Sequence, residues 1–451
     1  MPKKKTALTI EERLQQALVP AEEQPYEVPE NWVWVRLGGV TQVIGGGTPS
    51  TSKKEYYDGG TISWLSPVDL SNYNDIYISH GNKMITLEGL NNSSAKLLPK
   101  DTVCLTSRAP IGYVAIAENE LSTNQGFKSF LPSPTYLARF LYWYLKGNKE
   151  LLESKASGTT FLELSASKAA TIEFPLPPLS EQQRIVERIE ELFAKLDEAK
   201  ERLQEVADSF AVRKAAILHK AFTGELIGKK IEQLVPLESL VDLIKIGPFG
   251  SALHESDYIE NGIPLVNPKH IVQQHIVPQS KISISEEKAE ELSSYRLKAN
   301  DIVLGRRGEM GRCAPVSARE ENWICGTGSM IIRLKEEYDA RLYSLILGSQ
   351  ATVTYLENSA VGSTLKNLNE KIVRKIPVPQ FDIEEQHEIV RLIDDLLARE
   401  RAAQQATEQA LVSIDLMKKS ILARAFRGEL GTNKASEASA LELLRQVLAE
   451  N

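Results

Sequence analysis

Cysteine is scarce in this chain of 451 residues, and no apolar run is long. Its three cysteines, Cys104, Cys313 and Cys325, are an odd number, and none lies at C-x-x-C spacing. This argues against a disulfide framework or a structural zinc site and favours a reducing compartment. No stretch approaches the ~18 consecutive apolar residues of a membrane span, and no apolar segment follows the lysine-rich start as it would in a secretory signal. We therefore expect no membrane association.

Net positive charge and catalytic signatures are missing as well. Lysine and arginine number 53 against 60 acidic residues, a net charge of -7, which excludes a strongly basic, non-specific polyelectrolyte binder but not locally placed basic residues. There is no Asn/Asp-Pro-Pro-Tyr/Phe tetrapeptide to hold a flipped adenine and no G-x-x-x-x-G-K-[ST] phosphate loop. The glycines at 45–47 run into Thr48-Pro49, which predicts a turn rather than a nucleotide cradle. The chain is therefore not expected to be an enzyme by itself.

Two further groups have a catalytic and an ordinary interpretation. Glu286, Glu287 and Lys288 could form a nuclease cluster, but such a run at helical spacing is more often a solvated helix face. His270 and His275 could bind a metal, but no third ligand lies nearby in the sequence, so surface histidines are the favoured interpretation. We expect no metal site.

The chain does contain an internal repeat. Residues 217–226 (ILHKAFTGEL) and 421–430 (ILARAFRGEL) share seven of ten residues at an offset of 204. At the same offset, 181–192 (EQQRIVERIEEL) matches 385–396 (EQHEIVRLIDDL). From the repeat we expect six segments: an arm with a short helix over 1–30, a globular domain over 31–179, a long helix over 180–230, a second globular domain over 231–381, a second long helix over 382–430 and an arm with a short helix over 431–451.

The two long helices are predicted from the absence of glycine and proline over 181–223 and 383–427. Each would be roughly 65 Å long at about 1.5 Å per residue. The predicted capping boxes are Ser180 with Gln183 and Asp382 with Glu385, and the predicted C-terminal glycines are Gly224 and Gly428.

Both helices carry a heptad pattern, which predicts a coiled coil. The predicted seam of the first consists of Ile185, Ile189, Leu192, Leu196, Ala199, Leu203, Val206 and Phe210. That of the second consists of Ile389, Ile393, Leu396, Glu400, Ala403, Thr407, Ala410 and Ile414. The helices must be antiparallel, because the roughly ten residues that join the two units span at most ~35 Å and could not return along a parallel pair.

The globular segments mix short apolar runs with Gly, Pro, Asn and Ser turns, which indicates strands with a few helices. The predicted fold is therefore mixed α/β, with two globular domains separated by two long antiparallel helices in a coiled coil, related by a pseudo-two-fold internal repeat. The arms carry short apolar stripes, at Ile10, Leu14 and Leu18 and at Leu441, Leu444 and Leu448. Helices this short are unstable alone, so the arms pack either on this chain or on another subunit.

Several motifs taken together resemble one known family. They are NWVWVRLGGV at 31–40, GGTPST at 46–51, SRAPIGYVAI at 107–116, STNQGFKSF at 122–130, SGTTFLELS at 157–165, PLPPLSEQQRIVERIEELFAKLD at 175–197 and the two AF-x-GEL endings at 221–226 and 425–430. On these motifs the chain resembles, over essentially its whole length, the DNA specificity subunit of type I restriction–modification systems.

The resemblance implies two target recognition domains, each reading one half of a bipartite site in double-stranded DNA, with the helix pair fixing the gap. It implies assembly with two modification (methyltransferase) subunits that methylate adenine in each half with S-adenosylmethionine, and with restriction (translocase–nuclease) subunits that use ATP and Mg. It implies no cofactor in this chain and a location in the prokaryotic cytoplasm. The alternative is a non-DNA coiled-coil adaptor that presents two protein-binding heads.

Base readers in the major groove need donor and acceptor groups on loops. The candidate DNA contacts are Thr48, Ser50, Thr51, Lys53, Lys54, Ser107, Arg108, Asn124 and Gln125 in the first domain, and Lys269, Arg306, Arg307, Arg312 and Lys366 in the second. Each has the alternative interpretation of a turn residue or a surface charge. Arg306-Arg307 aligns with Ser107-Arg108 at an offset of 199, and Asn124-Gln125 aligns with Thr327-Gly328 or a neighbouring pair.

Overall fold

A computed structural model describes residues 9–108, 110–158, 162–360 and 367–450. The chain divides into two compact units. The first unit consists of residues 1–202 and 411–451, and the second of residues 203–410. Within the described ranges, no helix has both the length and the apolar composition needed to cross a membrane.

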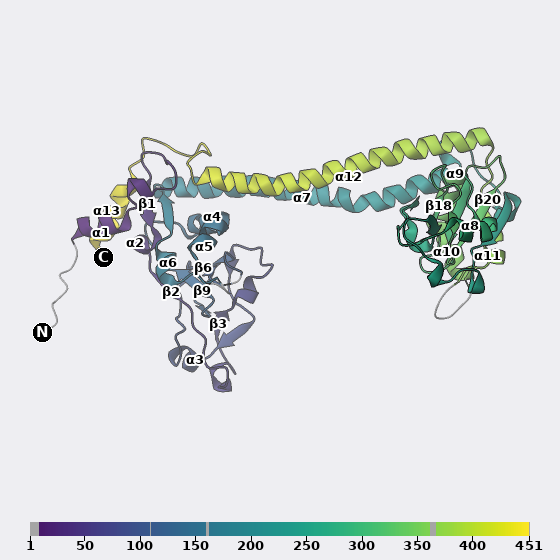
Figure 1. Ribbon diagram of the computed structural model, residues 1–451. Helices are drawn as coiled ribbons and strands as arrows, with labels where there is room; N and C mark the ends of the chain where they lie inside the picture. Colours follow the sequence, from purple (N-terminus) through teal and green to yellow (C-terminus); the bar gives the residue numbers. More distant parts are fainter. Residues whose placement is uncertain (1–8, 109, 159–161, 361–366, 451) are drawn as a thin grey trace. The chain divides into compact units, whose positions relative to one another are not determined.

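The first unit is built on a five-stranded sheet (Figure 1), of order β2-β9-β6-β7-β4. Its strands are β2 (Val43–Gly45), β9 (Phe127–Phe130), β6 (Val103–Thr106), β7 (Val114–Ala117) and β4 (Tyr77–Ile78). A three-stranded sheet joins β5 (Lys83–Ile85), β3 (Ile62–Leu65) and β8 (Ser122–Thr123), and a two-stranded one joins β1 (Val33–Arg36) and β10 (Glu173–Leu176). Its helices are α1 (Ile10–Ala17), α2 (Leu37–Val40), α3 (Leu87–Asn91), α4 (Ala138–Gly147), α5 (Lys149–Lys155), α6 (Ala166–Ala170) and α13 (Ala440–Glu450).

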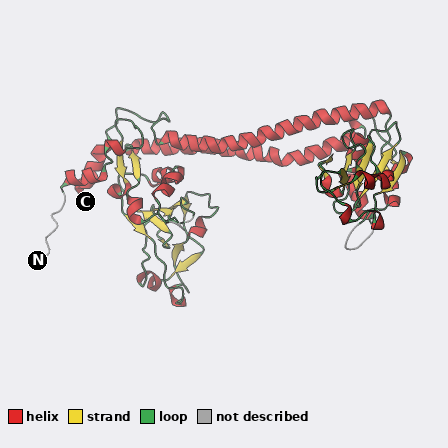
Figure 2. Cartoon of the chain, in the orientation of Figure 1, coloured by secondary structure: helices red, strands yellow, loops and turns green. Residues whose placement is uncertain are grey.

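The second unit repeats this plan. A four-stranded sheet has the order β12-β20-β17-β18, and a three-stranded sheet has the order β16-β13-β19. The strands of these sheets and of the two-stranded pairs are β11 (Val235–Pro236), β12 (Val241–Ile246), β13 (Ile263–Val266), β14 (Ile271–Val272), β15 (His275–Ile276), β16 (Ser283–Ile284), β17 (Asp301–Gly305), β18 (Cys313–Pro315), β19 (Ile324–Cys325), β20 (Ser329–Leu334) and β21 (Pro377–Val378). Its helices are α8 (Glu286–Glu291), α9 (Ala340–Leu347), α10 (Gln350–Ser359) and α11 (Glu370–Arg374). Figure 2 shows the strands of each unit gathered among short helices, which confirms the predicted mixed α/β repeat.

The two long helices are α7 (Leu179–Phe222) and α12 (Ile383–Ala425). Within the first unit, Lys200 Nζ lies 2.9 Å from a carboxylate oxygen of Asp415, and Lys418 pairs with Asp197. Residue numbers along α7 therefore increase as those of the facing residues on α12 decrease. Within the second unit, Arg213 of α7 pairs with Glu400 of α12 at 3.1 Å, and Lys229, which follows α7, pairs with Glu385 near the start of α12, in the same sense. The predicted antiparallel coiled-coil direction is confirmed in each unit.

The predicted seam is buried unevenly. Ile185, Ile189, Ile389 and Ile393 are fully buried where the helices pack on the globular parts. Leu192, Leu196, Leu203 and Leu396 are half-buried, and Phe210 and Ile414 are buried. Val206 is exposed, with 40% of its surface accessible. In the seam of α12, which includes the polar residues Glu400 and Thr407, Thr407 is buried and its hydroxyl donates to the carbonyl of Ala403 at 2.8 Å.

The helix ends confirm three of the predicted signals and correct one. Asp382 and Glu385 form a reciprocal capping box at the start of α12. Gly224 and Gly428 follow α7 and α12 in the left-handed conformation, with φ of +80° and +74°. Ser180 is not the cap of α7, because the carbonyl of Pro178 already accepts the N–H groups of Glu181 and Gln182 and the helix begins at Leu179.

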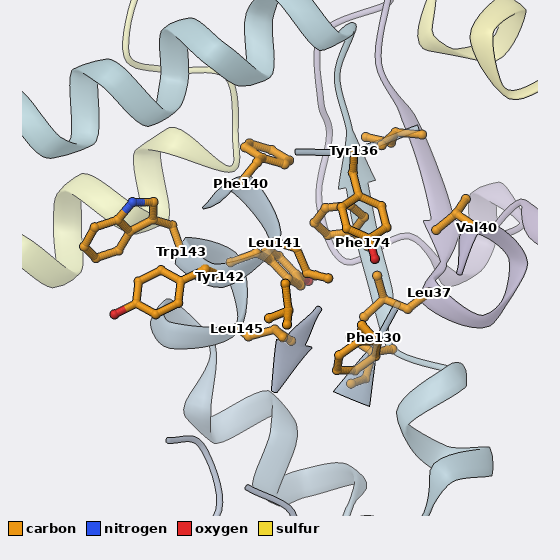
Figure 3. Close-up of a cluster of buried hydrophobic side chains, with 14 of the residues drawn as sticks. Leu37, Val40, Phe130, Tyr136, Phe140, Leu141, Tyr142, Trp143, Leu145 and Phe174 are labelled. Carbon is orange, nitrogen blue, oxygen red and sulfur yellow. The ribbon is translucent and has the colours of Figure 1, made fainter. Parts of the chain in front are cut away.

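Aromatic rings form the centre of the first unit (Figure 3). Tyr144 of α4 lies edge-on to Phe174 of β10 and to Phe426, with ring centroids 5.1 Å and 5.0 Å apart. Phe426, which directly follows α12, is almost fully buried there. In the second unit, Phe222 at the end of α7 packs on the equivalent core. The AF-x-GEL endings therefore anchor each long helix in a globular core. Removing the buried side chain of Phe426 should cost about 3–5 kcal/mol, and removing the half-buried side chain of Phe222 should cost less.

Both arms pack on this chain. The apolar faces of α1 and α13 are buried, at Leu14 and Ala17 and at Leu444 and Leu448. Arg13 also donates to the carbonyl of Leu448 at 2.8 Å. The predicted stripes are therefore buried or half-buried within the first unit except at Ile10, which is 46% exposed.

Candidate nucleic-acid interface

Four loops of the first unit meet at one edge, which we call its loop edge. They are the loop after β2 from Gly46, the loop after β3 from Ser66, the loop after β6 from Ser107, and residues 124–126. Backbone hydrogen bonds join them. The N–H of Ser107 donates to the carbonyl of Gly126 at 2.7 Å, and that of Asn124 donates to the carbonyl of Leu65 at 2.8 Å. The loops converge because the chain leaves neighbouring strands at the same edge.

The second unit has a loop edge with the same backbone bonds. The N–H of Arg306 donates to the carbonyl of Gly328 at 2.8 Å, and that of Gly326 donates to Val266 at 3.0 Å. Arg306 therefore corresponds to Ser107, which confirms the predicted alignment of Arg306-Arg307 with Ser107-Arg108. Asn124-Gln125 corresponds to the neighbouring pair Gly326-Thr327, one of the alternatives that the sequence left open.

The loop after β2 holds five of the predicted contacts. The hydroxyl of Thr48 donates to the side-chain oxygen of Gln125, so these two side chains are already joined. Lys53 Nζ donates to the hydroxyl of Tyr56 at 2.9 Å, and this bond raises the pKa of the lysine. Ser50, Thr51 and Lys54 are exposed. The exposed members offer hydroxyl and ammonium donors at the surface of the loop.

The loop after β6 contains one buried and one exposed candidate. Ser107 is fully buried and donates its hydroxyl to the carbonyl of Gly126 at 3.0 Å, so it supports the loop and does not reach the surface. The side chain of Arg108 is 48% exposed and lies 3.1 Å from a carboxylate oxygen of Glu163. That hydrogen bond holds the pKa of Glu163 below its usual range. Asn124 accepts the N–H of Gly126 at 2.8 Å and shapes its own turn.

Lys128 on β9 belongs to the same site, although the sequence gave no reason to select it. Its ammonium donates to the Ser107 hydroxyl at 3.1 Å and lies 3.7 Å from Glu163. Burial lowers its pKa. A lysine at alternate spacing in a strand normally points to solvent or packs over an apolar neighbour, so only the non-local pairing of β9 with β6 reveals its place.

The candidates of the second unit differ in their exposure. Lys269 and Arg307 are exposed. Arg306 is half-buried, and its Nε donates to the carbonyl of Leu368 at 3.0 Å; burial, followed by the nearby Arg307, lowers its pKa. Arg312 pairs with Glu309 and reaches the carbonyl of Pro268 at 3.4 Å. Lys366 lies outside the described residues.

The interpretation of His270 as a surface histidine was wrong. Its side chain is almost fully buried and its Nδ1 lies 2.8 Å from the carbonyl of Leu265. Desolvation lowers its pKa. His275 is exposed, as expected. The predicted helix face is α8, in which Glu286 and Glu287 are exposed and Lys288 is half-buried. Lys288 pairs with Glu291 at 2.8 Å. In the part of the chain that the structure describes, no three His, Cys, Asp or Glu side chains are placed to hold a metal.

A hollow of about 400 Å³ adjoins the loop edge of the first unit. It is lined by Thr51, Tyr57, Trp64, Lys83 and Met84. Trp64 is fixed by donating its indole N–H to the carbonyl of Gly47 at 2.9 Å. The loop edges thus combine exposed cationic and polar side chains with a rigid base, an arrangement that can bind phosphates and base edges.

Comparisons with known proteins point to one family. The model of the type I restriction modification DNA specificity domain matches residues 29–208 and 238–411. A Methanocaldococcus jannaschii type I restriction enzyme specificity subunit is 34% identical over 295 residues, which cover 63% of this chain and 68% of the relative. The Escherichia coli EcoBI specificity subunit is 29% identical over 345 residues, covering 70% and 72%.

The fold is also that of a solved structure. The crystal structure of the HsdS subunit from Thermoanaerobacter tengcongensis superposes with a TM-score of 0.64 at 20% sequence identity, covering 90% of this chain and all of that one. The family model matches each repeat separately, once per unit. The chain therefore belongs to the type I restriction–modification DNA specificity family.

Proposed function

We propose that each unit reads one half of a bipartite site in double-stranded DNA, and that α7 and α12 fix the gap between the halves. The observation that carries this proposal is the repeated loop edge. Both units assemble the same four loops with the same backbone bonds, yet they place different side chains at the surface there, such as Gln125 in the first unit and Thr327 in the second. A common frame with diverged side chains suits two readers of different sequences.

The chain directs chemistry that its partners perform. Two modification subunits bind S-adenosylmethionine and methylate adenine in each half-site, and restriction subunits use ATP and Mg to translocate and cleave DNA. The family membership supports this arrangement. The coiled-coil adaptor of proteins alone is not favoured, because it would require neither the DNA specificity family match nor the polar loop edges.

The partners also supply most of the phosphate contacts. Residues 31–175 carry 13 basic and 12 acidic residues, and residues 234–380 carry 17 and 18. Neither segment has the basic surface of an autonomous DNA binder, so the isolated chain binds DNA weakly. Tight, salt-insensitive binding by the isolated chain would contradict this.

The test is co-expression with the methyltransferase gene that neighbours this one, followed by mapping of methylated adenine in the genome by long-read sequencing. The expected result is a motif of two fixed halves separated by a constant gap. Arg108→Ala should relax or abolish recognition of one half, and Arg307→Ala of the other. A stable complex that adds no methylation would overturn the proposal and favour the adaptor.

A further inference from the structure

Phe249 is a large apolar side chain on the loop edge of the second unit, and 67% of its surface is exposed. Single exposed apolar residues are common on proteins and need no explanation by themselves. The surroundings of Phe249 are unusual, because the backbone on both sides of it is fixed.

The base of the loop is locked against a second loop. The N–H of Gly247 donates to the carbonyl of Ser329 at 2.9 Å. A Cβ on Gly247 would lie 2.1 Å from the carbonyl oxygen of Gly326, so no other residue fits there. Pro248, which follows, is buried and has a fixed φ. Gly250 then turns the chain in the left-handed conformation, with φ of +65°. The side chain of Phe249 is therefore held outward by a rigid turn.

The internal repeat identifies what stands at this place in the first unit. Gly46 donates to the carbonyl of Phe127 as Gly247 does to that of Ser329, and its Cβ position is blocked by Asn124 in the same way. Two residues after each of these glycines come Thr48 and Phe249. The first unit thus presents a hydroxyl where the second presents a phenyl ring.

We propose that Phe249 contacts the 5-methyl group of a thymine in the half-site read by the second unit. This rests on the proposed function of the loop edges. In the major groove, thymine alone among the four bases carries a methyl group, and a Phe side chain is one of the apolar groups that recognise it. The exposed cation Lys269 on the same loop edge supplies a phosphate contact, which holds the ring against the base edges.

The test uses the complex of this chain with its methyltransferase partner and duplexes that carry the mapped site. Each thymine is replaced in turn by deoxyuridine, which removes only the methyl group. For the wild-type complex, one position should lose about fourfold in affinity, the loss expected for one buried methyl group. The Phe249→Ala complex should bind the unmodified site several-fold more weakly and should show no further loss with deoxyuridine at that position.

Three variants serve as controls. Thr48→Ala should keep the full deoxyuridine penalty at the same thymine. Phe249→Leu, which remains apolar, should keep part of it. Leu234→Ala removes another exposed apolar side chain, 51% exposed and located before β11, and should leave the affinity unchanged.

Two outcomes would overturn the inference. One is a deoxyuridine penalty that is equal in the wild-type and Phe249→Ala complexes, and the other is site-specific binding without any thymine whose methyl group matters. Failure of the proposed function looks different, because the complex would then bind no specific sequence at all. All affinities are compared at one salt concentration, since phosphate contacts make them salt-dependent.

Discussion

A buried glutamine at the start of each long helix should be a main connection between that helix and its globular unit. Gln182 is fully buried. Its side-chain oxygen accepts the N–H of Leu137 at 2.8 Å, and its amide group donates to the carbonyls of Thr135 and Pro177 at 3.0 Å and 2.9 Å. One side chain therefore satisfies three backbone groups, one in the segment that leads into α7 and two in the loop that leads into α4.

The second unit repeats the arrangement. Gln386 accepts the N–H of Asp339 at 2.8 Å and donates to the carbonyls of Glu337 and Phe381 at 2.9 Å and 3.0 Å. The molecule therefore contains two independent copies of the same test. A loss of local stability in only one of the two glutamine variants would show that the pattern of hydrogen bonds does not determine how much each glutamine stabilises its unit.

Replacing Gln182 by alanine leaves these three backbone groups without this partner. At about 1 kcal/mol for each hydrogen bond, the loss is about 3 kcal/mol of local stability, which corresponds to roughly a hundredfold change in an opening equilibrium. Amide hydrogen exchange, followed by mass spectrometry on a peptide over 135–141, should become faster by about that factor. The matched peptide over 337–343 should not change in this variant and should respond instead to Gln386→Ala.

The control is Gln183→Ala, because Gln183 is exposed and its side-chain amide donates to Glu187 of the same helix at 2.8 Å. It should leave both peptides unchanged. Unaltered exchange at 135–141 in the Gln182→Ala chain would refute the reasoning, as would equal acceleration in both units, which would indicate a general loss of stability.

Three further predictions concern the helices, the C-terminal arm and the buried thiols. Inserting four residues into both α7 and α12 adds about 6 Å to each and should widen the preferred gap in the DNA site by one or two base pairs; mapped methylation with an unchanged gap would exclude the helices as the spacer. Arg184 holds Glu437 by two bonds of 2.8 Å, which lowers the pKa of that carboxyl. This ion pair therefore stabilises the arm above the ordinary carboxyl pKa of about 4.5, and the stabilisation is lost as the pH falls through the lowered pKa of Glu437. Proteolysis of residues 431–450 should increase in acid. The Glu437→Gln variant should be cleaved readily at neutral pH, and its cleavage should change less in acid. Burial raises the pKa of both Cys104 and Cys313 to about 12. A thiol reagent at pH 8 should therefore react with neither cysteine until the chain is unfolded. Rapid labelling of the native chain would contradict the burial of these two side chains.

The helices and the repeat could be predicted from the sequence because their signals are local. The absence of glycine and proline over 181–223 and the matched AF-x-GEL endings need no knowledge of distant contacts. The cap of α7 was placed two residues too late because Ser180 has the side chain of a cap, whereas the carbonyl of Pro178 accepts the first N–H groups of the helix.

The loop edges could be predicted only in part. Arg108 and Arg307 were selected by residue type, and the structure leaves both exposed at equivalent places. Ser107 was selected by the same reasoning, and His270 was interpreted as a surface histidine, but both side chains are buried. Phe249 was not predicted, because a criterion of hydrogen-bond donors and acceptors does not identify an apolar base contact.

The two units share a buried or half-buried cation at the loop edge, although different residues supply it. In the first unit, Lys128 of β9 places an ammonium group beside Ser107. In the second unit, the residue equivalent to Lys128 is Met330, and the cation comes instead from Arg306, at the place of Ser107. Both units therefore keep a half-buried or buried cation beneath the same loop, although different positions in the sequence supply it. The requirement is for a donor that satisfies oxygen atoms at the base of the loop, and the outward-facing positions, Thr48 and Phe249 among them, are free to differ.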